Sequence, residues 1–360
     1  MACFSKDSFF VYTLKIQLRK ESFEFVMEKM PRKSLLLTTF LLLVFPLFGQ
    51  GDRSKIEIVV PKDYRAPNLV NSPKLEAILK PAVEALVGEG AGRGFKAEEI
   101  AATLIDLRDP SRLAWASVNG ERQYYPASVP KMFYMAALQR QLEDGKILET
   151  AELARGEKDM VVDSSNDATQ YIVDVLTDTA SGSELPQAEF DRWQYQRNRM
   201  NRYFSAMGYT NINLNQKIYC EDAYGIEQQS RNYKGQNRNM LTTFATARML
   251  AEIVLGRLNT TERTKLMMDL LKREPFKPSN DPDNQAVGFT GKALIDLGMK
   301  DAKLWSKAGW TSRARHDAAY IETPDGLRFV LVVFTENHAN DRGSIGRVAS
   351  YVLQSLKQSS

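Results

Sequence analysis

Apolar residues recur at helical spacing near the start of the regularly patterned part of the chain. Leu75, Ile78 and Leu79 are followed by Val83 and Leu86, which is the stripe of an amphipathic helix. A serine that can cap the helix and a proline in the first turn precede this stripe. Further helices are expected over residues 128–143, 165–177, 190–206, 241–257 and 342–357.

Alternating apolar segments bounded by turn residues predict five strands. They cover residues 100–107, 113–118, 303–308, 314–322 and 327–335. Asn119-Gly120 is a hairpin signal after the second strand, and Pro324-Asp325-Gly326 is a turn before the last one.

The order of these elements predicts the fold class. A helix and two strands come first, then a long helical insertion, then three strands and a closing helix. We therefore expect an α/β (α+β) protein with an antiparallel sheet flanked by helices and a second, all-helical lobe. Residues 72–127 and 291–358 would form the sheet lobe, and residues 128–290 the helical lobe. The polar stretch 207–240 is expected to be an extended surface loop.

The segment that precedes these elements has the pattern of an export signal. Pro31-Arg32-Lys33 is followed by the uncharged apolar run 34–49 and then by small or polar residues. We predict a signal peptide over 30–51, a non-native N-terminal extension over 1–29 and a linker over 52–71. The expected location is periplasmic or secreted, with an N-terminal membrane anchor if the signal is not cleaved.

The residue composition argues against several kinds of active site. The chain has two cysteines and two histidines, His316 and His338. These numbers argue against a disulfide scaffold, a multi-histidine metal site and a Ser-His-Asp triad. A net charge of +4 over 360 residues is too small to indicate a nucleic-acid partner. We expect no cofactor, no metal and a monomer.

The sharpest local motif is Ser128-Val129-Pro130-Lys131 at the start of an apolar helix. Residues i and i+3 share a helix face, so the lysine amine can reach the serine hydroxyl. A lysine kept neutral by burial can remove the serine proton, and the helix N-terminus supplies N–H groups for an oxyanion. The alternative is a capping serine with an unrelated surface lysine.

Two further polar motifs occur later in the chain. Ser164-Ser165-Asn166 precedes a helix, and a helix N-cap is the alternative explanation for it. Lys307-Ala308-Gly309 falls on a predicted strand, where an edge lysine and a turn glycine are the alternative.

The three motifs in this order, S-x-x-K, S-x-N and K-x-G, resemble those of class A β-lactamases and penicillin-binding proteins. The likeness extends over about residues 72–358. It implies that Ser128 is acylated, that Lys131 helps to deprotonate it and that Ser164 passes a proton to the leaving nitrogen. Asn166 would hold the substrate amide, and Lys307 would attract the substrate carboxylate. The N–H groups of Ser128 and Trp310, after Gly309, would form the oxyanion hole.

The sequence departs from the family pattern at two functional positions. Lys-Ala-Gly lacks the usual hydroxyl residue, for which Ser306 or Thr311 is a substitute. The glutamate that activates the deacylating water would fall near Lys217 or Ile218, and neither is a carboxylate. Glu221, Asp222 and Glu227 lie slightly downstream in the same polar loop. Glu221 is the first candidate for this role and Glu227 the second; the alternative is that all three are solvated loop carboxylates.

These features leave three functions open. The first expectation is a serine hydrolase that opens an amide, above all a small-molecule β-lactam. The second is a D-alanyl-D-alanine peptidase or penicillin-binding protein that acts on cell-wall peptides. The third is a non-catalytic binding homologue of the fold.

Overall fold

The computed structural model describes residues 57–88 and 94–358, all within the unit Glu57–Ser360. These ranges hold seven strands and eleven α-helices. In chain order the elements are β1 (Leu69–Asn71), α2 (Pro73–Val87), β2 (Ile100–Asp106), β3 (Leu113–Val118), α3 (Pro130–Glu143), α4 (Ala151–Val161), α5 (Asn166–Thr177), α6 (Gln187–Arg197), α7 (Arg199–Ala206), α8 (Ile226–Arg231), α9 (Thr243–Val254), α10 (Thr261–Leu271), β4 (Lys272–Arg273), α11 (Thr290–Asp296), β5 (Lys303–Trp310), β6 (Ala314–Glu322), β7 (Arg328–Glu336) and α12 (Ser344–Gln358).

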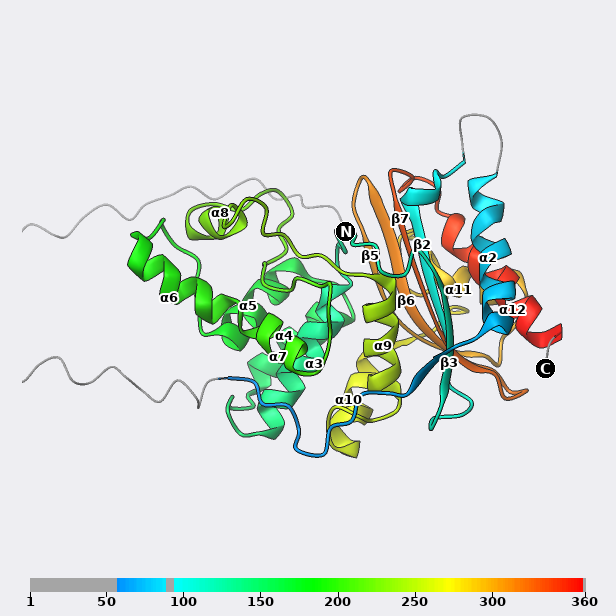
Figure 1. Ribbon diagram of the computed structural model, residues 1–360, viewed down its shortest axis with the longest axis horizontal. Helices are drawn as coiled ribbons and strands as arrows, with labels where there is room; N and C mark the ends of the chain where they lie inside the picture. The colour runs from blue at the N-terminus through cyan, green and yellow to red at the C-terminus, as the bar shows by residue number, and fades with distance from the viewer. Residues whose placement is uncertain (1–56, 89–93, 359–360) are drawn as a thin grey trace, which may run out of the picture. The chain divides into compact units, whose positions relative to one another are not determined.

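The strands form one sheet in the order β1-β3-β2-β7-β6-β5-β4 (Figure 1). Every neighbouring pair is antiparallel except β1 and β3, which are parallel. The five predicted strands are all present, and the expected fold class, a sheet with flanking helices and a helical lobe, is confirmed. β5 continues to Trp310, two residues beyond the predicted end.

Helices cover both faces of the sheet. Figure 1 shows α2, α11 and α12 on one side and α9 on the other. Successive strand residues point to opposite faces, so Ala319 and Ile321 of β6 pack in the cluster under α2 and α12. Ala318 and Tyr320 of the same strand pack in the cluster with α3 and α9. Because both faces are covered, β6 and β7 are apolar along most of their length.

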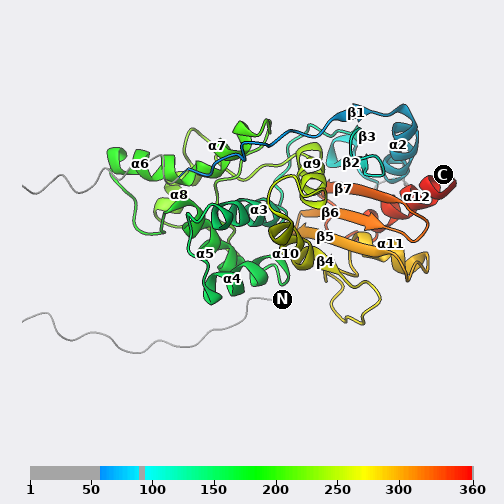
Figure 2. The same ribbon diagram turned by 90° about the horizontal axis from the view of Figure 1, so that it is seen from below.

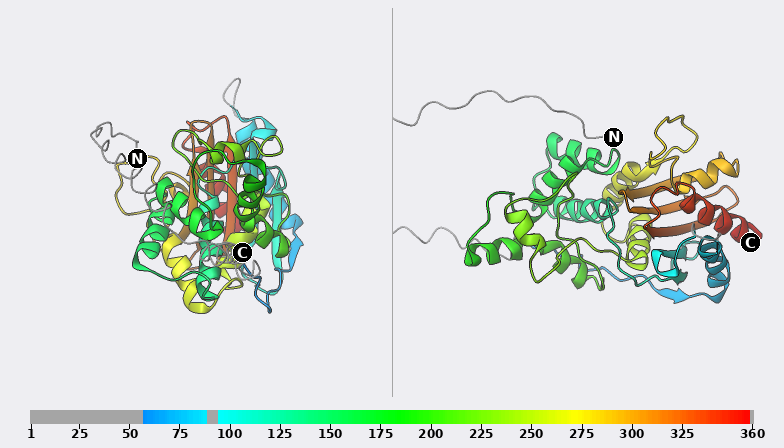
Figure 3. Two further views of the ribbon diagram at one scale, coloured as in Figure 1. Left: turned by 90° about the vertical axis from the view of Figure 1, so that its left-hand side faces the viewer. Right: turned by 90° about the horizontal axis from the view of Figure 1, so that it is seen from above.

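The helices α3 to α8 form the helical lobe, which lies beside the strands in Figures 2 and 3. α3 is its central helix, since every residue from Pro130 to Leu142 is buried. The polar side chains of this buried helix, such as Lys131 and Gln139, have hydrogen-bond partners. This position places the first turn of α3 between the helical lobe and the sheet.

Residues 57–71, where we expected a linker, make ordered contacts with the rest of the unit. Ile58 is buried, and the Tyr64 hydroxyl lies 3.0 Å from both carboxylate oxygens of Glu252 on α9. Leu69 begins β1, which pairs with β3. The contacts of the folded unit therefore begin before Ser72.

The sequence patterns missed several short elements. The helix predicted over 190–206 is two helices, α6 and α7, separated at Asn198. Four helices were not predicted: α4, α8, α10 and α11. α8 lies within a polar stretch, α10 buries only Met267 and Leu271, and α11 has seven residues, so their apolar periods are weak. α4 has buried residues at helical spacing, Leu153, Met160 and Val161, and was nevertheless not predicted.

The expectation that 207–240 is a surface loop is wrong for its middle part. Residues 214–218 are buried, and α8 lies within the stretch. Amide side chains pair with one another here: Asn215 Nδ2 donates to Asn237 Oδ1 at 2.9 Å, and Asn239 Oδ1 accepts from the backbone N–H of Gln216 at 2.9 Å. Polar residues can be buried when their hydrogen bonds are satisfied, and composition alone does not reveal this.

In the ranges that the structure describes, no helix is both long and apolar enough to cross a bilayer. The predicted extension 1–29 and signal 30–51 lie outside the described residues.

Candidate active site

Ser128 lies in a tight turn that leads into α3. The N–H of Val129 donates to Pro126 O at 3.1 Å, and Pro130 occupies the first helical position. Ala127 has a φ of +49°, a left-handed conformation that is costly for a residue with a side chain. The turn is therefore held in a strained form directly before the serine. Among the described residues the Ser128 hydroxyl has no hydrogen-bond partner.

His316 supports this turn from the sheet. Its Nδ1 accepts from the N–H of Thr335 at 3.2 Å, so Nε2 carries the proton and donates to Tyr125 O at 2.9 Å. Complete burial lowers the pKa of His316 to about 4. A neutral histidine thus fixes the backbone three residues before Ser128. His338 hydrogen bonds to Glu99 at 3.0 Å, so both histidines have structural partners.

Lys131 is the second residue of α3, three residues after Ser128, and is fully buried. Its Nζ donates to Ser164 O at 2.6 Å and to Asn166 Oδ1 at 2.8 Å, and it lies 3.2 Å from Ser164 Oγ. In the described part of the chain none of its hydrogen bonds goes to a carboxylate. Burial lowers the pKa of Lys131 to about 7, which makes the neutral amine accessible near neutral pH.

In the second motif, Ser165 caps a helix, and Ser164 and Asn166 belong to the candidate site. Ser165 caps α5, since its Oγ accepts from the N–H of Ala168 at 3.1 Å. Ser164 precedes the cap with a φ of +58°, and this conformation directs its polar groups toward Lys131. Asn166 is the first residue of α5 and binds Lys131. The N-cap explanation is correct for Ser165, while Ser164 and Asn166 face the two lysines.

Lys307 reaches the same hydroxyl from the sheet. Its Nζ lies 3.0 Å from Ser164 Oγ, 2.6 Å from Gln285 Oε1 and 2.8 Å from Ala308 O. Burial and the charge of Lys131 lower the pKa of Lys307 well below its ordinary value. Two buried amines therefore share one serine oxygen, and their repulsion disfavours a state in which both are charged.

Gly309 allows β5 to pack directly on the Ser128 turn. A Cβ at this position would lie 2.6 Å from Ser128 N and 2.9 Å from Pro126 O. Both are backbone atoms, so a side chain would displace the turn. The glycine of the third motif is thus a steric requirement for close contact between strand and serine.

The missing hydroxyl of the third motif is not replaced by Ser306. This residue is buried and neighbours Lys307 on the strand, so it points to the opposite face. Thr311 Oγ1 accepts from the N–H groups of Arg313 and Ala314 at 3.1 and 3.0 Å. The threonine hydroxyl is thus used in the turn after β5, close to Trp310.

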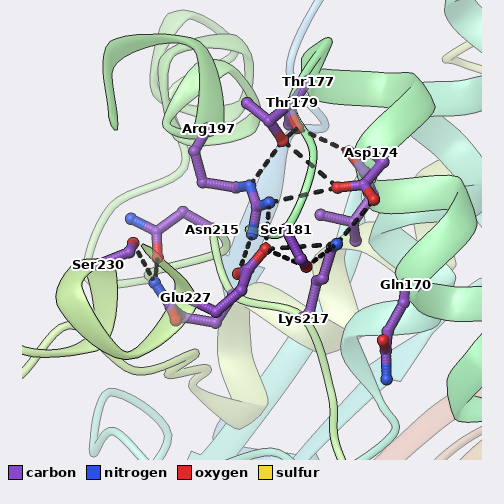
Figure 4. A network of polar contacts seen from close by, with 12 residues as sticks. Gln170, Asp174, Thr177, Thr179, Ser181, Arg197, Asn215, Lys217, Glu227 and Ser230 are labelled. Atoms are coloured by element: carbon purple, nitrogen blue, oxygen red, sulfur yellow. Dashed lines mark hydrogen bonds and ion pairs between the residues drawn. The ribbon is translucent and has the colours of Figure 1, made fainter. Parts of the chain in front are cut away.

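Glu227 belongs to a buried charge network of the helical lobe (Figure 4). Arg197 donates to both of its carboxylate oxygens, at 2.7 and 2.8 Å, and Ser181 donates at 2.9 Å. Burial alone would raise the pKa of Glu227, but Arg197 and Lys217 hold it below its ordinary value. Its hydrogen bonds all lie within this network, and none joins it to Ser128, Lys131 or Ser164.

Lys217, near the position expected for the family glutamate, is part of the same network. Its Nζ donates to Asp174 Oδ2 and to Ser181 Oγ, both at 2.7 Å. The charge of this amine is balanced by Asp174 of α5 and Glu227 of α8.

Glu221 is exposed and follows Cys220. Asn166 Nδ2 lies 3.6 Å from Cys220 Sγ, so the loop approaches the site at this point. The role of Glu221 as the deacylating carboxylate stays a prediction.

The assembled site is suited to acyl transfer. It joins a serine on a strained turn, two amines without carboxylate hydrogen bonds, and a second hydroxyl that contacts both amines. The Ser128 N–H donates to no acceptor among the described residues and lies beside Gly309 of β5, where it can donate to an oxyanion.

Sequence reasoning missed Gln285, which contacts Lys307. Glutamine carries no motif signal, and it lies in an irregular segment between β4 and α11. It also missed the strain at Ala127, because alanine gives no sign of a positive φ.

This fold and this arrangement of a serine, two lysines and an asparagine define a serine-hydrolase type of site. The chain belongs to the beta-lactamase enzyme family, whose pattern it matches over residues 80–356.

Solved structures support the assignment of the fold. A β-lactamase from Sphaerobacter thermophilus DSM 20745 is 19% identical, with a TM-score of 0.54, and covers 78% of this chain and 98% of its own. A mutant of PBP-A, solved as an acyl-enzyme complex with penicillin G, is 16% identical, with a TM-score of 0.54 and coverages of 81% and 99%. A β-lactamase from Chitinophaga pinensis DSM 2588 is 16% identical, with a TM-score of 0.53 and coverages of 79% and 99%. No curated protein matches the chain.

Proposed function

We propose that this protein opens the amide of a β-lactam by forming an acyl-enzyme at Ser128, with Lys131 as the general base. The observation that carries the proposal is the burial of Lys131 without a carboxylate hydrogen bond, one helical turn after the serine. Such an amine can be neutral at physiological pH and can accept the serine proton.

The first step is attack of Ser128 Oγ on the carbonyl carbon, while Lys131 Nζ takes the hydroxyl proton. The backbone N–H groups of Ser128 and Trp310 donate to the oxyanion of the tetrahedral intermediate. Its collapse breaks the C–N bond. The leaving nitrogen receives a proton from Ser164 Oγ, which is replenished by the ammonium of Lys131. The product is an ester on Ser128.

Positive charge at Lys307 favours a substrate that carries an anion. The amine is held by three neutral oxygens, one of which is the Ser164 Oγ that Lys131 also contacts. A carboxylate next to the scissile amide, as in penicillins, fits this potential.

Hydrolysis of the ester requires a group that activates water. In the described ranges no carboxylate hydrogen bonds to Lys131, Ser164 or Asn166, and Glu227 is bound to Arg197. This favours fast acylation and slow release, which is the behaviour of a penicillin-binding protein. A D-alanyl-D-alanine cell-wall peptide is the second substrate class that we propose, on the same observation.

Intact-mass spectrometry after incubation with penicillin G tests the proposal. We expect a covalent adduct that persists over many minutes in the wild type and is absent in Ser128→Ala. Ser306→Ala is the matched control, because it removes a hydroxyl from β5 on the face away from Lys307. Absence of an adduct on the wild type would refute acylation and favour a non-catalytic homologue.

The rate at which the adduct is hydrolysed distinguishes a β-lactamase from a penicillin-binding protein. Rapid hydrolysis that Glu221→Gln slows would identify a β-lactamase with Glu221 as its base. Hydrolysis that Glu221→Gln leaves unchanged would reject this glutamate.

We further propose that the enzyme acts outside the cytoplasm, as the export signal predicted over 30–51 suggests. Peptidoglycan precursors and β-lactams are both met there, so the location agrees with the substrates proposed above.

A further inference from the structure

An arginine from the loop that precedes α9 covers an aromatic ring beside the nucleophile. The guanidinium carbon of Arg238 lies 5.0 Å from the centroid of the Tyr125 ring. Tyr125 stands three residues before Ser128, and its carbonyl oxygen accepts from His316 Nε2 at 2.9 Å. The ring therefore belongs to the same turn that presents the nucleophile.

The backbone that carries Arg238 is fixed beside this turn. Tyr124 and Leu241 exchange two backbone hydrogen bonds, of 2.9 and 3.0 Å, in an antiparallel bridge. In an antiparallel pair the chain before Leu241 runs beside the chain after Tyr124, so Arg238 lies toward the nucleophile. Asn239 Nδ2 also donates to the Tyr134 hydroxyl of α3 at 2.9 Å. The loop is thus held against both the turn and the helix that follows it.

The polar groups of Arg238 and Tyr125 have no acceptor. In the ranges that the structure describes, the guanidinium of Arg238 makes no hydrogen bond or ion pair, and the Tyr125 hydroxyl has no hydrogen-bond partner. Arg238 is exposed, and Tyr125 is partly buried. Burial raises the pKa of Tyr125, so its hydroxyl is a donor at neutral pH. A guanidinium and a phenol O–H that both lack an acceptor suit a carboxylate.

The charged groups around Tyr125 leave a positive excess. Arg238 and Arg231 of α8 are the charged side chains that act on its hydroxyl. The carboxylate of Asp222 interacts with both arginines, and its ion pair is with Arg231. Because one acid faces two cations, the charge of Arg238 is available to a substrate.

Arg238 and Lys307 belong to different walls of the site. Lys307 lies on β5, whereas Arg238 lies in the loop before α9. In the proposed reaction the leaving nitrogen faces Ser164, and the carboxylate next to it faces Lys307. The acyl side chain extends from the other side of the carbonyl carbon. Lys307 would therefore bind the amine part of the substrate, which leaves Arg238 for the acyl part.

We propose that Arg238 and Tyr125 form a subsite for a carboxylate on the acyl side chain of the substrate, which favours acylation by β-lactams with an acidic acyl group. This inference rests on the proposed function, because it extends the acyl-enzyme site. The carboxylate would accept from the guanidinium and from the phenol, whereas a neutral acyl side chain would leave both donors to water.

Carbenicillin and penicillin G are matched probes, because carbenicillin differs only by an added carboxylate on the acyl side chain. The rate constant for acylation by each is measured by time-resolved mass spectrometry. Arg238→Gln removes the charge, Arg238→Lys retains it, and Tyr125→Phe removes the hydroxyl. Thermal unfolding shows that each variant is folded.

Arg122→Gln is the matched control. Arg122 is also exposed, and its guanidinium carbon lies 5.6 Å from the centroid of the Tyr124 ring. The Tyr124 hydroxyl already donates to Glu98 O at 2.8 Å. The control therefore removes a similar cation from a similar ring that offers no free hydroxyl.

We expect Arg238→Gln to lower the ratio of the carbenicillin rate to the penicillin G rate about fivefold, as for one partly exposed ion pair. Tyr125→Phe should lower the ratio by a smaller factor, and Arg238→Lys and Arg122→Gln should retain most of it. Added salt should lower the wild-type ratio, because exposed charges are screened. An unchanged ratio in Arg238→Gln, or an equal loss in Arg122→Gln, would overturn the inference.

Non-covalent binding separates this inference from the proposed reaction. Calorimetry gives the dissociation constants of both penicillins for Ser128→Ala and for the double variant with Arg238→Gln. We expect the double variant to lose about fivefold in affinity for carbenicillin relative to penicillin G. This loss would support the subsite even if the wild type formed no adduct and the proposed function had failed. An unchanged relative affinity would refute the subsite even if the wild type is acylated.

Discussion

Substitution of Gly309 by alanine isolates the contact between β5 and the serine turn. The new Cβ would lie 2.6 Å from Ser128 N, whereas ordinary contacts begin at 3.4 Å. The turn or the strand must therefore move by about 0.8 Å. Gly309 has no positive φ, so the effect is steric alone.

We expect Gly309→Ala to affect both the stability of the fold and the rate of acylation. Overpacking of this kind costs about 1–3 kcal/mol of unfolding free energy. A displacement approaching 1 Å at a nucleophile lowers the rate of its reaction by about 100-fold. We expect Gly309→Ala to be folded, with a reduced melting temperature, and to be acylated by penicillin G about 100-fold more slowly.

The assay combines urea unfolding with time-resolved mass spectrometry of the adduct. Gly182→Ala is the control, because a Cβ there meets no atom within 4 Å and the backbone has no positive φ. Acylation of Gly309→Ala at the wild-type rate would show that the turn adapts without cost and would contradict the steric argument.

Three more predictions concern the charged groups. Lys131→Met should abolish acylation. Because folding lowers the Lys131 pKa to about 7, the unfolding free energy of the wild type should rise from about pH 7 to 10.5, and the variant should show a smaller rise. Urea unfolding across this pH range measures the difference. The pKa of His316 is lowered to about 4 in the folded state. The unfolding free energy should therefore fall by up to about 3 kcal/mol as the pH drops from 6.5 to 4, because only the unfolded state binds a proton at this histidine in that range. A His316→Leu variant with the same acid dependence would refute this. Glu227→Gln should lower the unfolding free energy by about 3–5 kcal/mol, because it removes one of the two acids that Arg197 and Lys217 share and leaves Asp174 alone to balance two buried cations. The folded fraction should still be acylated at the wild-type rate.

Much of the fold could be predicted because its strongest signals are local. The five long strands and the helices α2, α5, α9 and α12 have clear apolar periods. Short helices such as α8 and α11 lack this period, and β1 forms by pairing with the neighbouring β3. These elements depend on tertiary partners that no local pattern reveals.

Four residues chosen from the motifs, Lys131, Ser164, Asn166 and Lys307, contact one another in the structure, but the motifs alone did not show how. Ser128, Lys131, Ser164, Asn166 and Lys307 were chosen from three short segments. Ser165 caps α5 whereas Ser164 contacts the two lysines, and this difference depends on the positive φ of Ser164. Glu227 is bound to Arg197 and not to the residues of the candidate site. Arg197 lies thirty residues earlier in the chain, and no sequence spacing predicts this pair.

The hydrogen bond between Ser164 and Lys307 spans 143 residues of sequence. Contacts of this separation form late, because loop closure must precede them. α3, which carries Lys131 and follows Ser128, can form early, yet the reactive cluster cannot exist until β5 has joined the sheet. In a refolding experiment, helical signal should therefore recover before reactivity toward penicillin, and the adduct will report the completion of folding.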